Sequence, residues 1–69
     1  MKIDMKVTQN YAKFTDDESG ITMFVDSHDN IEFNVRIGNI EESHDVGSII
    51  ALNTVDLQNK LNNIFNTHK

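Results

Sequence analysis

Two similar four-residue runs hold the side chains best suited to chemistry, Asp26-Ser27-His28-Asp29 and Glu42-Ser43-His44-Asp45. A histidine flanked by carboxylates can bind zinc or a similar cation. In an antiparallel meander, however, successive connections lie at opposite ends of the sheet, so the two runs cannot hold one ion within a single chain. We interpret both runs as turn and loop residues. A small metal-binding domain that uses His28 or His44 is the least favoured of three functional hypotheses.

The adjacent Ser, His and Asp side chains also invite comparison with a catalytic triad. A triad needs three side chains that converge from separate elements, together with donors for an oxyanion, and consecutive loop residues rarely converge. The sequence has no Gly-x-Ser-x-Gly, no phosphate-binding glycine loop, no His-Glu-x-x-His and no cysteine. We therefore predict a protein that is not an enzyme, with no catalytic residues, no metal ligands and no cofactor.

Acidic side chains gather in two predicted loops, residues 15–20 and 41–47. Adjacent carboxylates repel one another and favour exposed loops over packed elements. Such runs can simply keep a small domain in solution, or they can present carboxylates to a basic groove and compete there with nucleic acid. Under the second interpretation the predicted partner-binding residues are Asp16, Asp17, Glu18, Phe24, Glu41, Glu42 and Asp45.

Phe24 is included because its position in a predicted strand places it on the face opposite the core. There it can stand exposed as an anchor for a partner. Alternatively, Phe14 or Tyr11 folds over it and forms a small satellite cluster. The sequence favours neither arrangement.

The elements that position these residues are organised around residues 21–37. Apolar and polar side chains alternate over 31–37, the period of a strand with one buried face. Residues 21–26 have the same period, and the Asp, Ser, His and Asn residues between the two are typical of a turn. The pattern predicts a β-hairpin.

Two further strands are expected. Alternation at the start of the chain predicts a strand over about 2–8, with a bulged extension to 14 favoured over a turn at Gln9-Asn10. A short strand is expected over 48–52, apolar on both sides.

The last element is a helix over about 54–67. Asn53 or Thr54 can cap it, and Asp56 falls in the first turn, where free N–H groups favour a carboxylate. A single apolar stripe at helical spacing follows. It consists of Leu57, Leu61, Ile64 and Phe65.

These elements predict one α+β domain over residues 1–69. It is a small antiparallel β-meander of three to five strands with one C-terminal helix packed on one face. The expected core consists of Ile3, Met5, Val7, Ile21, Met23, Val25, Ile31, Phe33, Val35, Ile37, Leu57, Leu61, Ile64 and Phe65.

Size and charge limit the function. A chain of 69 residues without cysteine has a small core and often relies on a partner or a second copy. A net charge of −5 opposes direct binding to nucleic acid or anionic membranes and favours basic or neutral protein partners. No apolar run is long enough to cross a bilayer. We expect a cytoplasmic protein of a bacterium or of a phage-infected host.

We therefore predict a non-enzymatic, small acidic protein-binding module, homodimeric, that binds through its acidic loops. In size and charge the chain resembles small acidic phage or mobile-element proteins that inhibit or modulate nucleic-acid-handling host proteins by mimicking nucleic acid, and the resemblance extends to no motif. The alternative is a structural or self-assembling accessory protein that uses a sheet edge or the helix.

Overall fold

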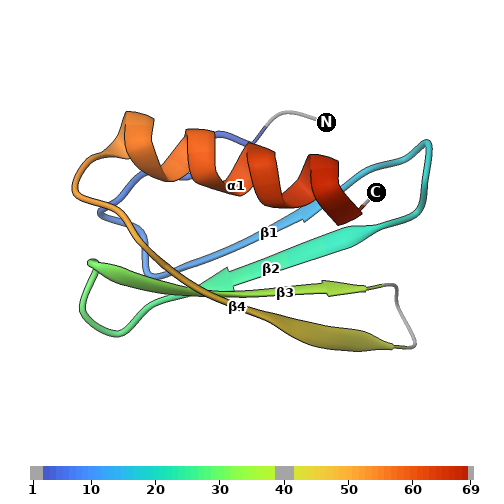
Figure 1. The fold of residues 1–69 in the computed structure, drawn as a ribbon, viewed down its shortest axis with the longest axis horizontal. Helices are drawn as coiled ribbons and strands as arrows, with labels where there is room; N and C mark the ends of the chain where they lie inside the picture. Colours follow the sequence, from blue (N-terminus) through green and yellow to red (C-terminus); the bar gives the residue numbers. More distant parts are fainter. Residues whose placement is uncertain (1–2, 39–41, 69) are drawn as a thin grey trace.

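The computed structural model describes residues 3–38 and 42–68, and within them four strands precede one helix (Figure 1). The strands form a single antiparallel sheet in the order β1-β2-β3-β4. This confirms the predicted α+β meander with a C-terminal helix. The elements are β1 (Tyr11–Thr15), β2 (Thr22–Asp26), β3 (Glu32–Gly38), β4 (Ser43–Ile50) and α1 (Thr54–His68).

The hairpin of β2 and β3 has the register that its alternation predicts. Met23 lies opposite Ile37 and Val25 opposite Val35, and all four side chains are buried. Residues that pair directly across antiparallel strands share a face, so these four define an inner face. Phe24 and its neighbours in alternation define the outer face.

Helix α1 covers the inner face (Figure 1). The predicted stripe is confirmed, because Leu57, Leu61 and Phe65 are buried and Ile64 is half-buried against the core. Removing these apolar side chains from water is the main favourable term that holds the helix on the sheet. The buried cluster consists of Ile3, Met5, Met23, Val25, Phe33, Val35, Ile37, Ala51, Leu57, Leu61 and Phe65.

The start of α1 is fixed by Asn53, one of the two predicted caps. Its side-chain oxygen accepts the Asp56 N–H at 2.8 Å, and its carbonyl accepts the Leu57 N–H at 3.0 Å. Asp56 also forms an ion pair of 3.0 Å with Lys60, one turn later. The Asn53 side chain therefore satisfies one of the free backbone donors of the first helical turn.

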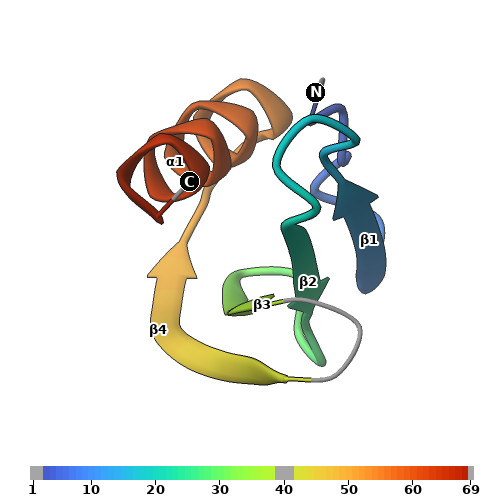
Figure 2. The ribbon, with the colours of Figure 1, turned by 90° about the vertical axis from the view of Figure 1, so that its right-hand side faces the viewer.

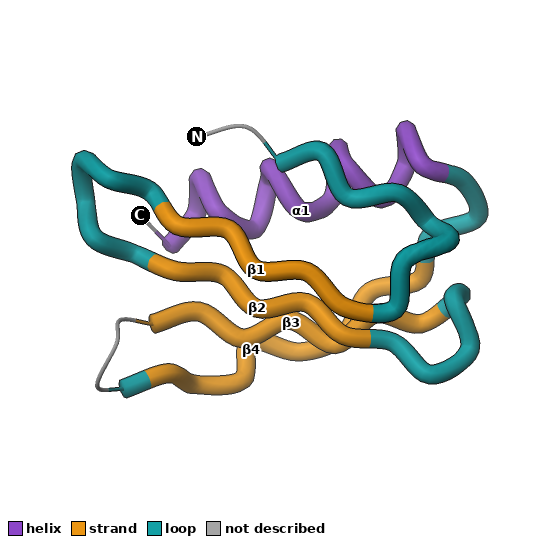
Figure 3. The backbone as a smooth tube through the Cα atoms, turned by 180° about the vertical axis from the view of Figure 1, so that it is seen from behind, coloured by secondary structure: helices purple, strands orange, loops and turns teal. Residues whose placement is uncertain are grey.

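The strand predicted over 2–8 is wrong, as is its bulged extension, because residues 3–10 lie outside the sheet and the first strand begins at Tyr11. Ile3 and Met5 are nevertheless buried, as predicted. The segment runs between α1 and β1 (Figure 3), so it shares with α1 the cover of the inner face. A turn closed by the Gln9 N–H on the Lys6 carbonyl, at 2.9 Å, then leads back towards β1.

Side chains, rather than a neighbouring strand, satisfy the backbone of this segment. The Val7 N–H donates to the Thr54 hydroxyl at 3.2 Å, and the Val7 carbonyl accepts the Asn30 amide at 3.0 Å. The Met5 carbonyl accepts the Gln58 amide at 3.3 Å. Because buried backbone groups need partners of some kind, these bonds allow an alternating sequence to be buried without pairing.

The strand observed in place of the one predicted over 48–52 is longer and begins five residues earlier in the chain. β4 begins at Ser43, so much of the predicted loop 41–47 is strand. Between Val35 and Arg36 of β3 the register shifts, and Val46 is an extra residue that opposes neither. The bulge uses Gly47 at φ 110°, whose N–H is accepted by the Asp45 carboxylate at 2.8 Å. Figure 2 shows β4 curving from the edge of the sheet towards α1.

One core prediction at the end of the sheet is wrong. Ile31 is 51% exposed, although it has the buried phase, because it precedes β3 at the end of the sheet. Ala51 is buried instead, and its N–H donates to the Ile31 carbonyl at 3.0 Å. Val7 and Ile21 are half-buried against the core.

Candidate functional site

The meander places the two predicted acidic loops at the same end of the molecule. The loop between β1 and β2 and the start of β4 both lie at the end where α1 terminates (Figure 1). We call this the acidic end, defined by Asp16, Asp17, Glu18 and Glu42. The predicted residue Glu41 lies outside the described residues. The C-terminal carbonyls of α1 add the negative pole of the helix dipole here.

The β1–β2 loop owes its shape to Asp16. The Asp16 carboxylate accepts the Glu18 N–H at 3.2 Å and the Ser19 hydroxyl at 3.0 Å, and its backbone exchanges bonds of 2.8 Å with Ile21 and Gly20. Gly20 supplies the positive φ of 75° that the exit from this turn requires. Asp16 is therefore a loop-forming residue, and Asp17 and Glu18 stand exposed at the tip.

A groove separates this loop from the last turns of α1. Its volume is about 340 Å³, at the small end of the range for ligand pockets. Three of its lining residues carry carboxylates, two carry side-chain amides, and Phe65, which belongs to the buried core, forms part of its floor. It is lined by Thr15, Asp16, Asp17, Glu18, Asn62, Phe65 and Asn66.

The chemistry of that lining suits a cationic group. Carboxylate and amide oxygens can accept hydrogen bonds from an ammonium or guanidinium. Asn62, Phe65 and Asn66 were not among the predicted site residues. The alternation of ends in a meander, combined with a helix that returns along the sheet, would have placed the end of α1 beside residues 16–18.

Phe24 lies on the outer face, as its phase predicts, and is half-buried. The Arg36 guanidinium lies over the Phe24 ring, 5.7 Å from the ring centroid. The two residues pair directly across β2 and β3. Lys13 pairs with Phe24 from the other side. Of the alternatives left open by the sequence, a cluster of Phe14 over Phe24 does not form, because Phe14 lies opposite Met23 and packs against the core.

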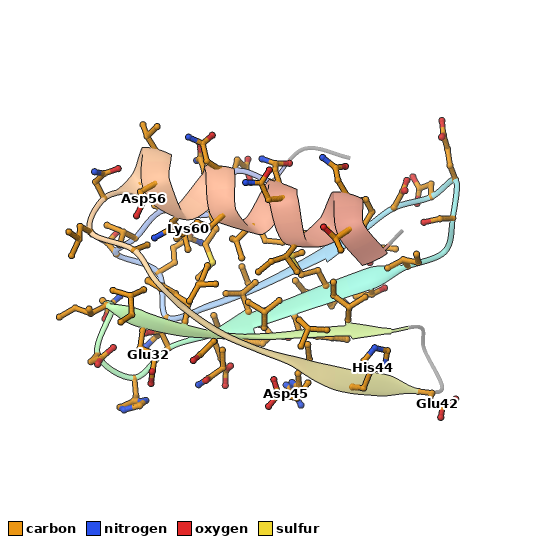
Figure 4. All side chains as sticks on the ribbon, in the orientation of Figure 1. Glu32, Glu42, His44, Asp45, Asp56 and Lys60 are labelled. Atoms are coloured by element: carbon orange, nitrogen blue, oxygen red, sulfur yellow. The ribbon has the colours of Figure 1, made fainter. Side chains whose placement is uncertain are left out.

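Asp45 does not lie in a loop. It occupies the outer face of β4 opposite Arg36, and its carboxylate accepts the Gly47 N–H in the bulge. Figure 4 shows Asp45 and Glu32 on the side of the sheet away from α1. Lys13, Phe24, Arg36 and Asp45 therefore form one row across the four strands.

The histidines occupy opposite ends of the sheet, which confirms the argument against a shared ion. His28 lies in the β2–β3 loop and His44 near the start of β4. Figure 4 shows the His44 ring on the helix side of β4, whereas the Glu42 carboxylate points away from it. Among residues 3–38 and 42–68 no three His, Cys, Asp or Glu side chains are arranged to hold a metal ion.

The Ser27-His28-Asp29 run forms a turn, as predicted. The buried Ser27 hydroxyl donates to the Glu32 carbonyl at 2.7 Å and accepts the Asn30 N–H at 2.9 Å. The Asp29 carboxylate accepts the N–H groups of Glu32 and Ile31 at 2.9 and 3.0 Å. These two backbone bonds, that to Glu32 first, lower the pKa of Asp29 below its ordinary value.

Comparison with known proteins yields no matching family model, curated protein or solved structure. Within the described part of the chain, no helix has the length and apolar character needed to cross a membrane.

Proposed function

We propose that this protein is a non-enzymatic protein-binding module whose acidic end binds a basic partner. The observation that carries the proposal is the groove between the β1–β2 loop and α1, which surrounds one opening with carboxylates and amides. A lysine or arginine side chain of a partner would fill it, with Asp17 and Glu18 at its rim. The proposed groove thus keeps Asp16, Asp17 and Glu18 of the predicted set. Glu42 lies at the same end of the molecule but outside the groove, and Phe24 and Asp45 lie on a separate face.

Charge supports the same proposal. A net charge of −5 on 69 residues steers association towards basic surfaces and away from the phosphates of nucleic acid. Clustered Lys and Arg side chains are typical of the grooves in which proteins bind nucleic acid. We therefore propose an inhibitor or modulator that occupies such a groove in place of nucleic acid, in the cytoplasm of a bacterium or of a phage-infected host.

The test is a pull-down from lysate of the source cell with three tagged baits. The wild type is compared with the pair Asp17→Asn and Glu18→Gln, which leaves the loop-forming Asp16 intact. The control carries Asp4→Asn and Asp26→Asn, two exposed positions outside the acidic end, so both variants lose the same charge.

We expect a nucleic-acid-binding protein to be retained by the wild type and the control and lost by the acidic-end variant. Added salt or competing DNA should release it from the wild type, because the contact is electrostatic. Equal recovery by all three baits, or release by neither salt nor DNA, would reject the proposal.

A further inference from the structure

Every large apolar side chain that stands exposed among the described residues lies at one end of the molecule, opposite the acidic end. Each of the five exposes half or more of its surface, from 51% for Ile31 to 82% for Leu52. We call this the apolar end. It consists of Tyr11, Ile31, Ile50, Leu52 and Val55.

The register explains why these residues meet there. Tyr11 begins β1 opposite Asp26, the last residue of β2, and Ile50 ends β4 opposite Glu32, the first residue of β3. The bond of 3.0 Å from the Ala51 N–H to the Ile31 carbonyl brings Ile31 beside the β4–α1 connection. That connection carries Leu52, and Val55 follows in the first turn of α1. Figure 1 shows the β2–β3 loop and the start of α1 at this end.

Two of the carboxylates at this end are already engaged within the chain. Asp29 accepts backbone N–H groups from Ile31 and Glu32, and Asp56 is paired with Lys60 at 3.0 Å. Lys60 compensates the charge of Asp56, whereas Asp29 keeps its charge, and Asp26 and Glu32 add two further carboxylates opposite Tyr11 and Ile50.

We propose that the apolar end is the contact surface of a symmetric homodimer. The five side chains expose roughly 500 Å² in total, which is as large as the largest apolar patch on a typical monomer. A standard interface buries about 800 Å² on each partner, a little over half of it non-polar. The patch thus supplies the apolar area that one side of such an interface contains.

For a second copy of this chain, the distribution of charge favours one orientation. Two chains of net charge −5 repel each other least when their acidic ends point away from the contact. The long axis of one molecule is 29 Å, several times the Debye length of about 8 Å in physiological salt. Contact through the two apolar ends places the acidic ends at the far tips of the dimer. This inference does not depend on the proposed function.

Sedimentation velocity over a range of concentrations tests the dimer, with one variant at the centre of the patch. Leu52→Lys reduces the net charge, so weaker association cannot result from greater overall repulsion. Asn63→Lys makes the same charge change at an exposed position in the second half of α1 and is the matched control. We expect a dimer in the wild type and the control, and an association at least tenfold weaker in Leu52→Lys.

Because Leu52 is exposed, the variant should fold, and an unchanged circular dichroism spectrum would verify this. A wild type that stays monomeric up to about 1 mM would overturn the proposal, as would a Leu52→Lys variant that dimerises like the control.

Spin labels test the orientation, since the chain has no cysteine and one can be introduced by Glu18→Cys. The proposal predicts a distance between the two labels close to twice the 29 Å long axis. A distance no greater than one molecular length would show a different interface.

Discussion

Asn30 and Val7, 23 positions apart in the chain, are joined by a hydrogen bond of 3.0 Å from the Asn30 amide to the Val7 carbonyl. Asn30 has a positive φ of 61°, a conformation that asparagine tolerates better than most residues. Asn30 therefore helps to close the β2–β3 loop through its backbone and holds the N-terminal segment through its side chain.

Replacing Asn30 separates these two roles. Asn30→Ala should cost about 2 kcal/mol, the sum of one lost hydrogen bond and the strain of a left-handed alanine. Asn30→Gly relieves the strain and should cost about 1 kcal/mol, mainly through the lost bond. Urea unfolding measures both, and limited proteolysis should cleave residues 3–10 faster in both variants than in the wild type. Equal unfolding free energies for the two variants would contradict the assigned strain.

Ionisation of the Asp29 carboxyl should make the stability of the fold depend on pH in the acidic range. Because its pKa is lower in the folded protein than its ordinary value of 3.8, it stabilises the fold while ionised, above that value. This contribution is lost as the pH falls through the lowered pKa. Asp29→Asn keeps an acceptor oxygen but no titrating group. The wild type should therefore melt at a higher temperature than this variant near neutral pH, and the difference should shrink below about pH 4.

Thermal melts at a series of pH values measure that difference. Asp17→Asn, at the tip of the other loop, is the control for removing one negative charge. A difference between wild type and Asp29→Asn that stays constant down to the acid limit would mean that the two backbone bonds do not favour the ionised form.

The contact of Arg36 with the Phe24 ring should contribute a measurable coupling energy. At 5.7 Å from the centroid and on an exposed face, a cation–π contact is worth about 0.5 to 1 kcal/mol. A double-mutant cycle with Arg36→Gln and Phe24→Leu should recover this coupling. A cycle that pairs Phe24→Leu with the distant Lys60→Gln should give additive effects. Additivity in the first cycle as well would show that the two side chains do not interact.

The sequence alone predicts the parts of this fold in which alternation and burial coincide. Met23, Val25, Val35 and Ile37 have one periodic face and lie in paired strands, and Leu57 begins a helical stripe that is buried as expected. The N-terminal segment has the same alternation but no strand beside it. Alternation of apolar and polar residues indicates which side chains are buried. It does not indicate whether a neighbouring strand or a side chain provides the hydrogen-bond partners of the backbone.

In β4, by contrast, a strand forms where the sequence pattern predicts a loop. Its first residues, Ser43 to Asp45, are polar and exposed at the edge of the sheet. They therefore show no alternation of apolar and polar side chains from which a strand could be predicted. The candidate groove was also only partly predictable. Asp16, Asp17 and Glu18 stand out by charge, whereas Asn62 and Asn66 resemble any exposed amides on a helix until the return of α1 along the sheet is known.

The bulge at Val46 has a consequence for behaviour at high concentration. A straight eight-residue edge would be a template on which further chains could add strands without limit. Here the extra residue bends the edge. The Asp45 carboxylate accepts the Gly47 N–H, so this donor is not available to another strand, and the carboxylate places a negative charge at the edge. The β4 edge therefore resists the strand addition that leads to fibres.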